Sequence, residues 1–121
     1  MLGSHDFARS KRFYDAVLGT LGVAPATPDA RQRLMYWHRG ALFLVGPPLN
    51  GEPATVVNGG TIGFTYDSEA DVEAWHAAGI ANGGATCEDP PWPRAGPGMA
   101  LSLAYLRDPD GHKLCAVYRP G

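Results

Sequence analysis

The predicted order of elements is the same in the first and second halves of this 121-residue chain. Each half is expected to hold a strand, then a helix, then further strands, which is the pattern of an internal duplication. The segment "PPLNGEPATVVNGG", rich in Pro, Gly and Asn, falls between the halves and is predicted as a connector. Neither half is large enough to bury its own sheet face, so the two must pack together, in one chain or across a dimer. The sequence therefore predicts a single domain over residues 1–121, with one module at about 1–50 and a second at about 58–120.

Cap residues locate the two helices. In "HDFARSKRFYDAVLGTLGV", Asp6 is placed to accept a backbone N–H of the first turn. In "SEADVEAWHAAGIANGG", Ser68 is the cap and Asp71 stands at the capping-box position. Strands are predicted in "RLMYWHRGALFLVG", "TIGFTYD", "ATCED", "MALSLAYLRD" and "HKLCAVY", and "PPWPRAGPG" is predicted as a loop.

The composition excludes several classes of protein. Hydrophobic residues make up 45% and charged residues 18% of the chain, which is typical of a globular protein. The net charge is −2 and the Lys and Arg residues are scattered, so nucleic acid is not an expected partner. There is no apolar run of membrane-spanning length, and the first residues lack the apolar core of a secretory signal. The 2 cysteines make no disulfide framework, so a reduced cytoplasmic protein is expected.

The segment "YLRDPDGHKLCAVY" is predicted to be a hairpin closed by a type I turn at residues 108–111. The turn fixes the register, so Lys113, Cys115 and Val117 share one face of the last strand. His112 and Cys115 are three positions apart and point to opposite faces, which excludes a catalytic Cys–His pair made of these two residues. His112, next to the turn, is expected to be exposed to solvent.

The strand "TIGFTY" offers a matching face. Thr61, Gly63 and Thr65 alternate with the apolar Ile62 and Phe64. Because helices usually cover the more apolar face of a sheet, the Thr61 side of this strand and the Cys115 side of the last strand are expected to lie on the opposite surface. The sequence thus predicts a cleft lined by small polar groups.

Several candidate residues keep two interpretations. Cys115 is either a reactive thiol, helped by Lys113 on the same face, or a small apolar residue that lines a pocket. Trp92 and Arg94 lie in "DPPWPRAGPG", which either closes over a ligand or is a surface loop held by its prolines. Trp37 and the preceding tyrosine point to opposite faces of one strand, so one packs under a helix while the other lines the cleft.

The other histidines give weaker indications. His5 is either a cleft residue or an exposed loop residue. His38 adjoins a predicted turn and is expected to be exposed, whereas His76 shares a helix face with Trp75 and is expected to be packed and hydrogen-bonded.

Three segments carry a family resemblance. "LGSHDFARSKRFYDAVLGTLGV" resembles the opening of the glyoxalase/bleomycin-resistance group, the vicinal oxygen chelate superfamily. "AYLRDPDGHKLCAVY" resembles its closing signature, an aromatic-x-R-DPDGN-x-hydrophobic-E pattern, and "GGTIGFTYDSEADVEAWHAAGIANGG" resembles the start of its second module. The resemblance implies an α+β fold of two βαβββ modules whose curved mixed sheets enclose a cleft, and a homodimer. It also implies a divalent metal held by His, Gln or Glu side chains, although members include metal-free antibiotic-binding proteins.

The metal ligands implied by the resemblance are not matched in this chain. The first-strand His would fall before Met1, the second-module position is Thr61, and the last-strand carboxylate is replaced by Cys115. A neutral hydroxyl is a poor metal ligand, and one thiol supplies only one of the three or four protein ligands of a zinc site. No cofactor is therefore expected, and a divalent metal would need a ligand upstream of Met1.

These observations lead to one preferred hypothesis and two alternatives. The preferred hypothesis is a glyoxalase-fold protein with a degenerate metal site that binds a small organic molecule, and that contacts neither nucleic acid nor membrane. The alternatives are a lyase- or dioxygenase-like enzyme of the same superfamily and a non-catalytic dimeric scaffold. The residues expected to bind the small molecule are Trp37, Thr61, Trp92, Arg94, Lys113 and Cys115.

Overall fold

The computed structural model describes residues 1–88, 92–96 and 99–120. The first module forms a sheet with strand order β1-β4-β3-β2, in which β1 runs parallel to β4 and the other pairs are antiparallel. Its elements are β1 (Leu2–Gly3), α1 (Phe7–Gly19), β2 (Thr27–Pro28), β3 (Leu34–His38) and β4 (Ala41–Gly46).

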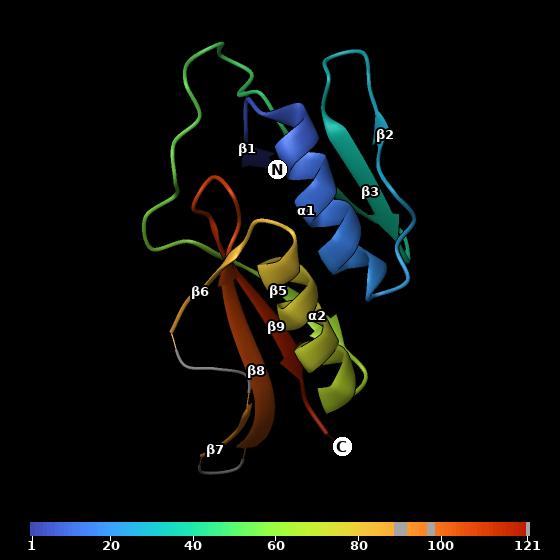
Figure 1. Ribbon diagram of the computed structural model, residues 1–121, viewed down its shortest axis with the longest axis vertical. Coiled ribbons are helices and arrows are strands. Elements are labelled where there is room, and N and C mark those ends of the chain that lie inside the picture. Colours follow the sequence, from blue (N-terminus) through green and yellow to red (C-terminus); the bar gives the residue numbers. More distant parts are fainter. Residues whose placement is uncertain (89–91, 97–98, 121) are drawn as a thin grey trace.

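The second module repeats this plan. Its strand order is β5-β9-β8-β6, with β5 parallel to β9, and β7 adds to the edge of β8. The predicted α+β fold with two modules is confirmed, and the two sheets do not close into a barrel within the chain (Figure 1). The elements are β5 (Thr61–Tyr66), α2 (Glu69–Ala81), β6 (Ala85–Thr86), β7 (Trp92–Gly96), β8 (Met99–Arg107) and β9 (Lys113–Tyr118).

The prediction of a loop over "PPWPRAGPG" was wrong for its central residues. Residues 92–96 form β7, which pairs antiparallel with β8 from Trp92–Leu103 to Gly96–Met99. A proline is tolerated in a strand that has a neighbour on one side only, because its missing N–H can face away from the ladder. Proline content alone therefore did not distinguish a loop from an edge strand.

Both helices begin at the predicted caps. The Asp6 side chain accepts the backbone N–H of Arg9 at 3.0 Å, and the Ser68 hydroxyl accepts that of Asp71 at 3.1 Å. A Cβ added at Gly79 of α2 would lie 2.2 Å from a methyl carbon of Leu106, so the glycine lets this helix approach β8. Within the described residues, no helix is long and apolar enough to cross a membrane.

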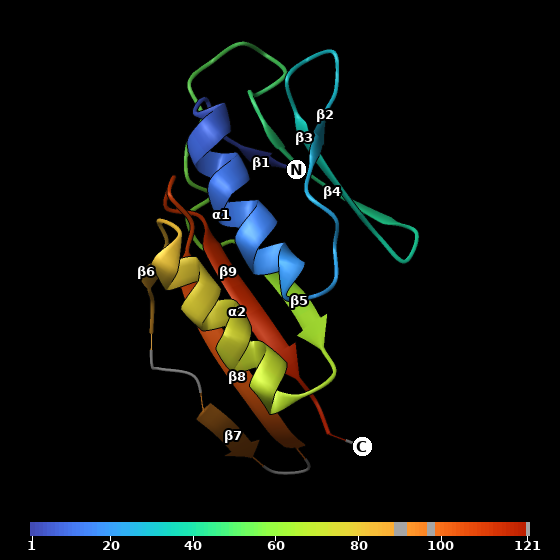
Figure 2. The ribbon, with the colours of Figure 1, turned by 45° about the vertical axis from the view of Figure 1, so that its right-hand side comes forward.

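The helices lie side by side on one side of the molecule, with α2 against β8 and β9 (Figure 2). The core is the layer between helices and sheets, and it contains Phe13, Tyr14, Tyr36, Trp75, Leu106 and Leu114. The predicted alternation in β9 is present, because Leu114 and Ala116 are fully buried beneath the helices whereas Cys115 is half-buried. Neither α1 nor α2, the two helices in the described residues, covers the opposite surface of either sheet (Figure 2).

Candidate functional site

Strand register brings three of the predicted site residues onto one surface. Thr61 of β5 pairs with Lys113 of β9, and Gly63 pairs with Cys115 two residues further along. Cys115 also pairs with Tyr105 of β8 on its other side. We call this surface the second-sheet face; it consists of Thr61, Gly63, Thr65, Tyr105, Arg107, Lys113, Cys115 and Val117.

A polar cluster occupies one end of the second-sheet face. The Lys113 ammonium lies 3.0 Å from a carboxylate oxygen of Glu88 and 4.8 Å from the centre of the Tyr105 ring. The hydrogen bond to Glu88 raises the pKa of Lys113, so the ammonium is charged at neutral pH. The aromatic ring attracts the same cation through its negative face. Together these contacts hold a positive charge beside Cys115.

The environment of Cys115 favours the neutral thiol. Burial raises the pKa of this thiol, and the positive charge of Lys113 and a hydrogen bond to Tyr105 offset the effect only in part. The thiol points to the carbonyl oxygen of Ala116, with a sulfur-to-oxygen distance of 3.6 Å. A nucleophilic or metal-binding cysteine acts as the thiolate, so this environment suits a pocket-lining thiol better than a reactive one.

The second-sheet face does not fit the metal that the resemblance implies. At the two positions where the resemblance implies metal ligands, this chain has the hydroxyl of Thr61 and the thiol of Cys115, and both groups are neutral. Within the described part of the chain, no group of three His, Cys, Asp or Glu side chains could hold a metal ion. The donor set of this face therefore provides no site for a hard divalent cation.

The remaining predicted site residues lie on other strands. Trp37 lies on β3 of the first sheet, beside Leu42 of β4, is 59% exposed, and is apart from this cluster. Trp92 and Arg94 belong to β7, where their backbones pair with Leu103 and Leu101 of β8; since Leu103 pairs with Val117 on its other side, the register places both β7 positions at the edge of the second-sheet face. The side chains of Trp92 and Arg94 lie outside the described part of the structure, so their predicted roles stay predictions.

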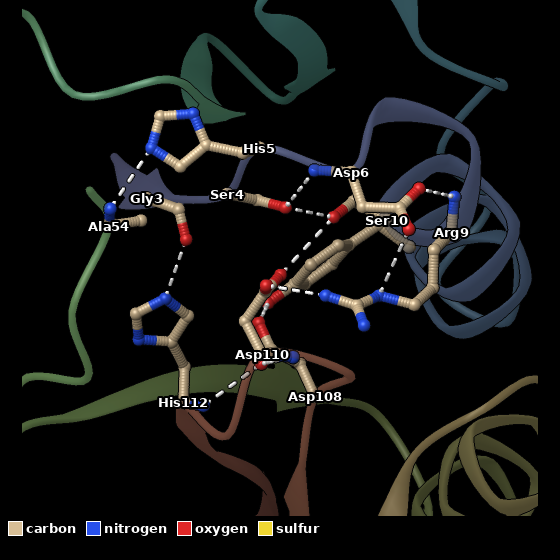
Figure 3. A network of polar contacts seen from close by, with 11 residues as sticks. Gly3, Ser4, His5, Asp6, Arg9, Ser10, Ala54, Asp108, Asp110 and His112 are labelled. Atoms are coloured by element: carbon tan, nitrogen blue, oxygen red, sulfur yellow. Dashed lines mark hydrogen bonds and ion pairs between the residues drawn. The ribbon is translucent and has the colours of Figure 1, made fainter. Parts of the chain in front are cut away.

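The prediction that His112 is exposed was wrong, because only 3% of this residue is accessible to solvent. The turn at residues 108–111 folds back against the first module, and the His112 Nε2 atom lies 2.9 Å from the carbonyl oxygen of Gly3 in β1 (Figure 3). His38 is half-buried rather than exposed. These burials arise from contacts between distant segments, which residue type and adjacency to a turn do not reveal.

The other two histidines are not fully buried. His5 is exposed, and its Nε2 accepts the backbone N–H of Ala54 at 3.0 Å. His76 is half-buried and lies 3.3 Å from the hydroxyl of Thr86, and burial lowers its pKa.

A buried polar network joins the opening of the chain to its closing turn. The Asp108 carboxylate accepts the hydroxyl of Tyr14 at 2.5 Å and the backbone N–H groups of Asp110 and His112, each at 2.9 Å. Asp110 in turn binds the guanidinium of Arg9 at 2.7 Å (Figure 3). We call this set of contacts, with the bond from His112 to β1, the motif junction. It joins the first and last of the three segments that carry the family resemblance and positions one module against the other.

A cavity of about 460 Å³ lies between the two modules. Its walls come from the end of α1 and the residues after it, from β3 and β4, and from β5. The sequence analysis did not identify this cavity, because its walls meet only through packing between segments far apart in the chain. Its apolar lining residues are Leu18, Leu21, Val23, Tyr36, Ala41, Leu42, Phe43, Ile62 and Phe64.

Comparisons with known proteins place this fold among its relatives. The family described as the Glyoxalase/Bleomycin resistance protein/Dioxygenase superfamily matches residues 1–116. A glyoxalase/bleomycin resistance protein from Albidiferax ferrireducens T118 is 51% identical, with a TM-score of 0.93, 98% of this chain covered and 95% of that one. A glyoxalase-related enzyme from Fulvimarina pelagi shares the fold at 22% identity, with a TM-score of 0.70 and coverage of 98% and 84%. None of the curated proteins matches the chain.

The match extends over both modules and includes both ends of the motif junction. The open sheets, the parallel pairing of first and last strands in each module, and the closing turn agree with it. The chain belongs to the glyoxalase/bleomycin resistance protein/dioxygenase superfamily.

Proposed function

We propose that this protein binds a small organic molecule on the second-sheet face without using a metal held by that face. One observation carries the proposal. The positions at which the resemblance implies metal ligands hold neutral Thr61 and Cys115, whereas a charged cluster around Lys113 lies beside them. A face with one cation, a hydroxyl and an aromatic ring suits a polar organic molecule that carries a hydrogen-bond acceptor.

The ligand would contact Lys113 through its acceptor group. The ammonium has three donors, and its bond to Glu88 uses one of them. Glu88 itself has a backbone φ of 58°, which is uncommon for a residue with a side chain and keeps its carboxylate next to β9. The half-buried Tyr105 ring and Val117 would cover the apolar part of the molecule.

A second copy of the chain would complete the cleft. The first sheet also has an uncovered face, where Trp37 is 59% exposed and Leu42 is 42% exposed, with Met35 and Leu44 paired beside them. Exposed apolar surface of this kind marks contact sites, and a symmetric dimer is the commonest way for a chain to cover it. Sedimentation of wild type and Trp37→Ser is the test. We expect a dimer that Trp37→Ser weakens, and a wild-type monomer at 100 μM would refute this part of the proposal.

The binding proposal is tested by elemental analysis together with a thermal-shift screen of small carboxylates, phenols and amides. We expect less than stoichiometric Ni, Zn, Fe, Mn and Co after growth with added metals, and at least one compound that raises Tm. The shift should be lost in Lys113→Met and kept in the control Lys11→Met, a half-buried lysine of α1 paired with Asp15. One metal ion per chain would refute the metal-free proposal in favour of a lyase- or dioxygenase-like enzyme. A screen in which no compound raises Tm would favour the non-catalytic scaffold.

A further inference from the structure

The inter-module cavity lies along the edge of β5, next to the second-sheet face but apart from the cluster around Lys113. Its β5 lining includes the half-buried Ile62 and Phe64, and also Gly63 and Thr65 of the second-sheet face. Its first-sheet lining includes Tyr36 and Phe43, which are core-facing residues of β3 and β4, and the exposed Leu42. Among the described residues, its lining does not include Thr61, Lys113 or Cys115.

The wall of the cavity is built around aromatic rings. The rings of Phe43 and Phe64 meet edge to face, with centroids 5.6 Å apart and an angle of 85° between their planes. The Tyr36 ring lies 6.3 Å from that of Phe43, and its hydroxyl is bound to Asp15 at 2.9 Å. The Tyr36 hydroxyl is the one polar group of these three side chains, and it is already hydrogen-bonded to Asp15. The three rings therefore present apolar surface to the cavity.

Charged groups lie only at the mouth of the cavity, among the described lining residues. Arg39 and Asp67 are 3.9 Å apart, and their side chains are 77% and 83% exposed. Because the two charges are opposite and both are solvated, the mouth selects neither an anion nor a cation. His38 and Thr65 add polar groups at the same end of the cavity. The charge distribution therefore favours an uncharged occupant.

The size of the cavity limits what can fill it. Its lining includes the exposed residues Ala41 and Leu42, so the cavity opens to solvent, and its volume is about 460 Å³. Ligand pockets span about 300–1,000 Å³. An apolar cavity of about 150 Å³ holds one benzene molecule, so this cavity has room for two or three aromatic rings.

From these observations we infer that the inter-module cavity is a second binding site, for an uncharged molecule of two or three aromatic rings. The rings stack against Phe43 and Phe64, and any polar substituent points to the mouth between His38 and Thr65. This site shares Gly63 and Thr65 of β5 with the second-sheet face but does not include Lys113, which carries the small-molecule site proposed there. Binding links the end of α1 to β5, so it stabilises one module against the other.

The test uses N-phenyl-1-naphthylamine, a neutral aromatic probe whose fluorescence rises in apolar surroundings. We expect saturable binding with one probe per chain, and a probe at one hundred times its Kd should raise Tm by roughly 10 °C. Two variants fill the cavity from its rim, Ala41→Trp on the exposed start of β4 and Leu21→Trp after α1. Each should weaken probe binding at least tenfold. Circular dichroism reports whether each variant is folded. Because the two variants change different walls of the cavity, the second still tests the inference if the first does not fold.

Two controls separate this site from the second-sheet face. Leu49→Trp adds the same ring at a position that is 78% exposed and outside the cavity lining, and it should leave the probe affinity unchanged. Lys113→Met should also leave it unchanged. The inference would be overturned by non-saturable fluorescence, by one probe per two chains, or by folded Ala41→Trp and Leu21→Trp proteins with wild-type affinity. Loss of the probe in Lys113→Met alone would assign it to the second-sheet face instead.

Discussion

Removing a single oxygen atom tests the motif junction. In Tyr14→Phe, the aromatic ring and its edge-to-face contact with Phe13 at 4.9 Å remain, but the hydroxyl that donates to the Asp108 carboxylate is lost. Both partners are buried, since Tyr14 is 0% and Asp108 is 4% exposed. The second carboxylate oxygen keeps its two backbone donors, so the turn itself should survive.

The expected loss follows from the charge on Asp108. A hydrogen bond to an ionised group contributes about 1.5–3 kcal/mol, and a buried carboxylate oxygen left without its donor carries its own desolvation cost. We therefore expect Tyr14→Phe to lower the free energy of unfolding by about 2 kcal/mol, which for a chain of this length lowers Tm by about 8 °C.

Urea unfolding followed by circular dichroism is the assay, and Tyr66→Phe is the matched control. Tyr66 is also buried, but the hydrogen-bond partners of its hydroxyl among the described residues are neutral, namely Thr20 at 2.8 Å and the Val17 carbonyl oxygen at 3.2 Å. That variant should lose about 1 kcal/mol. Equal losses in the two variants, or no change in Tyr14→Phe, would refute the reasoning that the buried carboxylate makes the junction the stronger contact.

Three further predictions concern single features of the fold. Burial raises the pKa of Tyr66 to about 12, so the folded state holds a proton that the unfolded state releases above its ordinary pKa of about 10. The contribution of Tyr66 to stability in urea should therefore be constant below pH 10 and be lost between pH 10 and 12, so stability should fall more steeply there in wild type than in Tyr66→Phe; identical slopes would contradict this. Gly79→Ala should lower the free energy of unfolding by about 1–3 kcal/mol, because the new methyl group overlaps Leu106, and the double variant with Leu106→Ala should lose less than the sum of the two single losses, since the overlap is then removed. His112→Asn should cost about 1 kcal/mol in thermal unfolding, since the shorter side chain cannot keep the bond to the Gly3 carbonyl oxygen; an unchanged Tm would show that this bond contributes nothing.

The features that the sequence predicted correctly are local ones. Helix caps at Asp6 and Ser68 depend on residues within one turn, and both are present. The alternation around Cys115 depends on the two-residue period of a strand, which a short segment displays in full. The closing turn also formed, with the N–H of Gly111 bonded to the Asp108 carbonyl oxygen at 2.9 Å and Gly111 at a φ of 94°.

What the sequence did not reveal depends on segments far apart in the chain. His112 is buried because β1, more than one hundred positions away, lies against its ring. The inter-module cavity has three walls from three separate segments, none of which is unusual by itself. Residues 92–96 pair with β8 although their proline content is typical of loops. The candidate site was predicted only in part. The two-residue alternation of a strand shows which side chains share a face, but it does not show which other elements cover that face.

The motif junction also has a consequence for how the protein is made. The ion pair between Arg9 and Asp110 joins residues that are 101 positions apart. During synthesis, Arg9 therefore has no partner until almost all of the chain has been made. A nascent chain whose closing hairpin is still inside the ribosome leaves Tyr14 without its acceptor and α1 without the turn that docks on it. Contacts of such long range form late and slow folding. A protein shortened by its final hairpin would therefore lose order not only in the second sheet, where β5 pairs with β9, but also at its opposite end, in β1 and the first turns of α1.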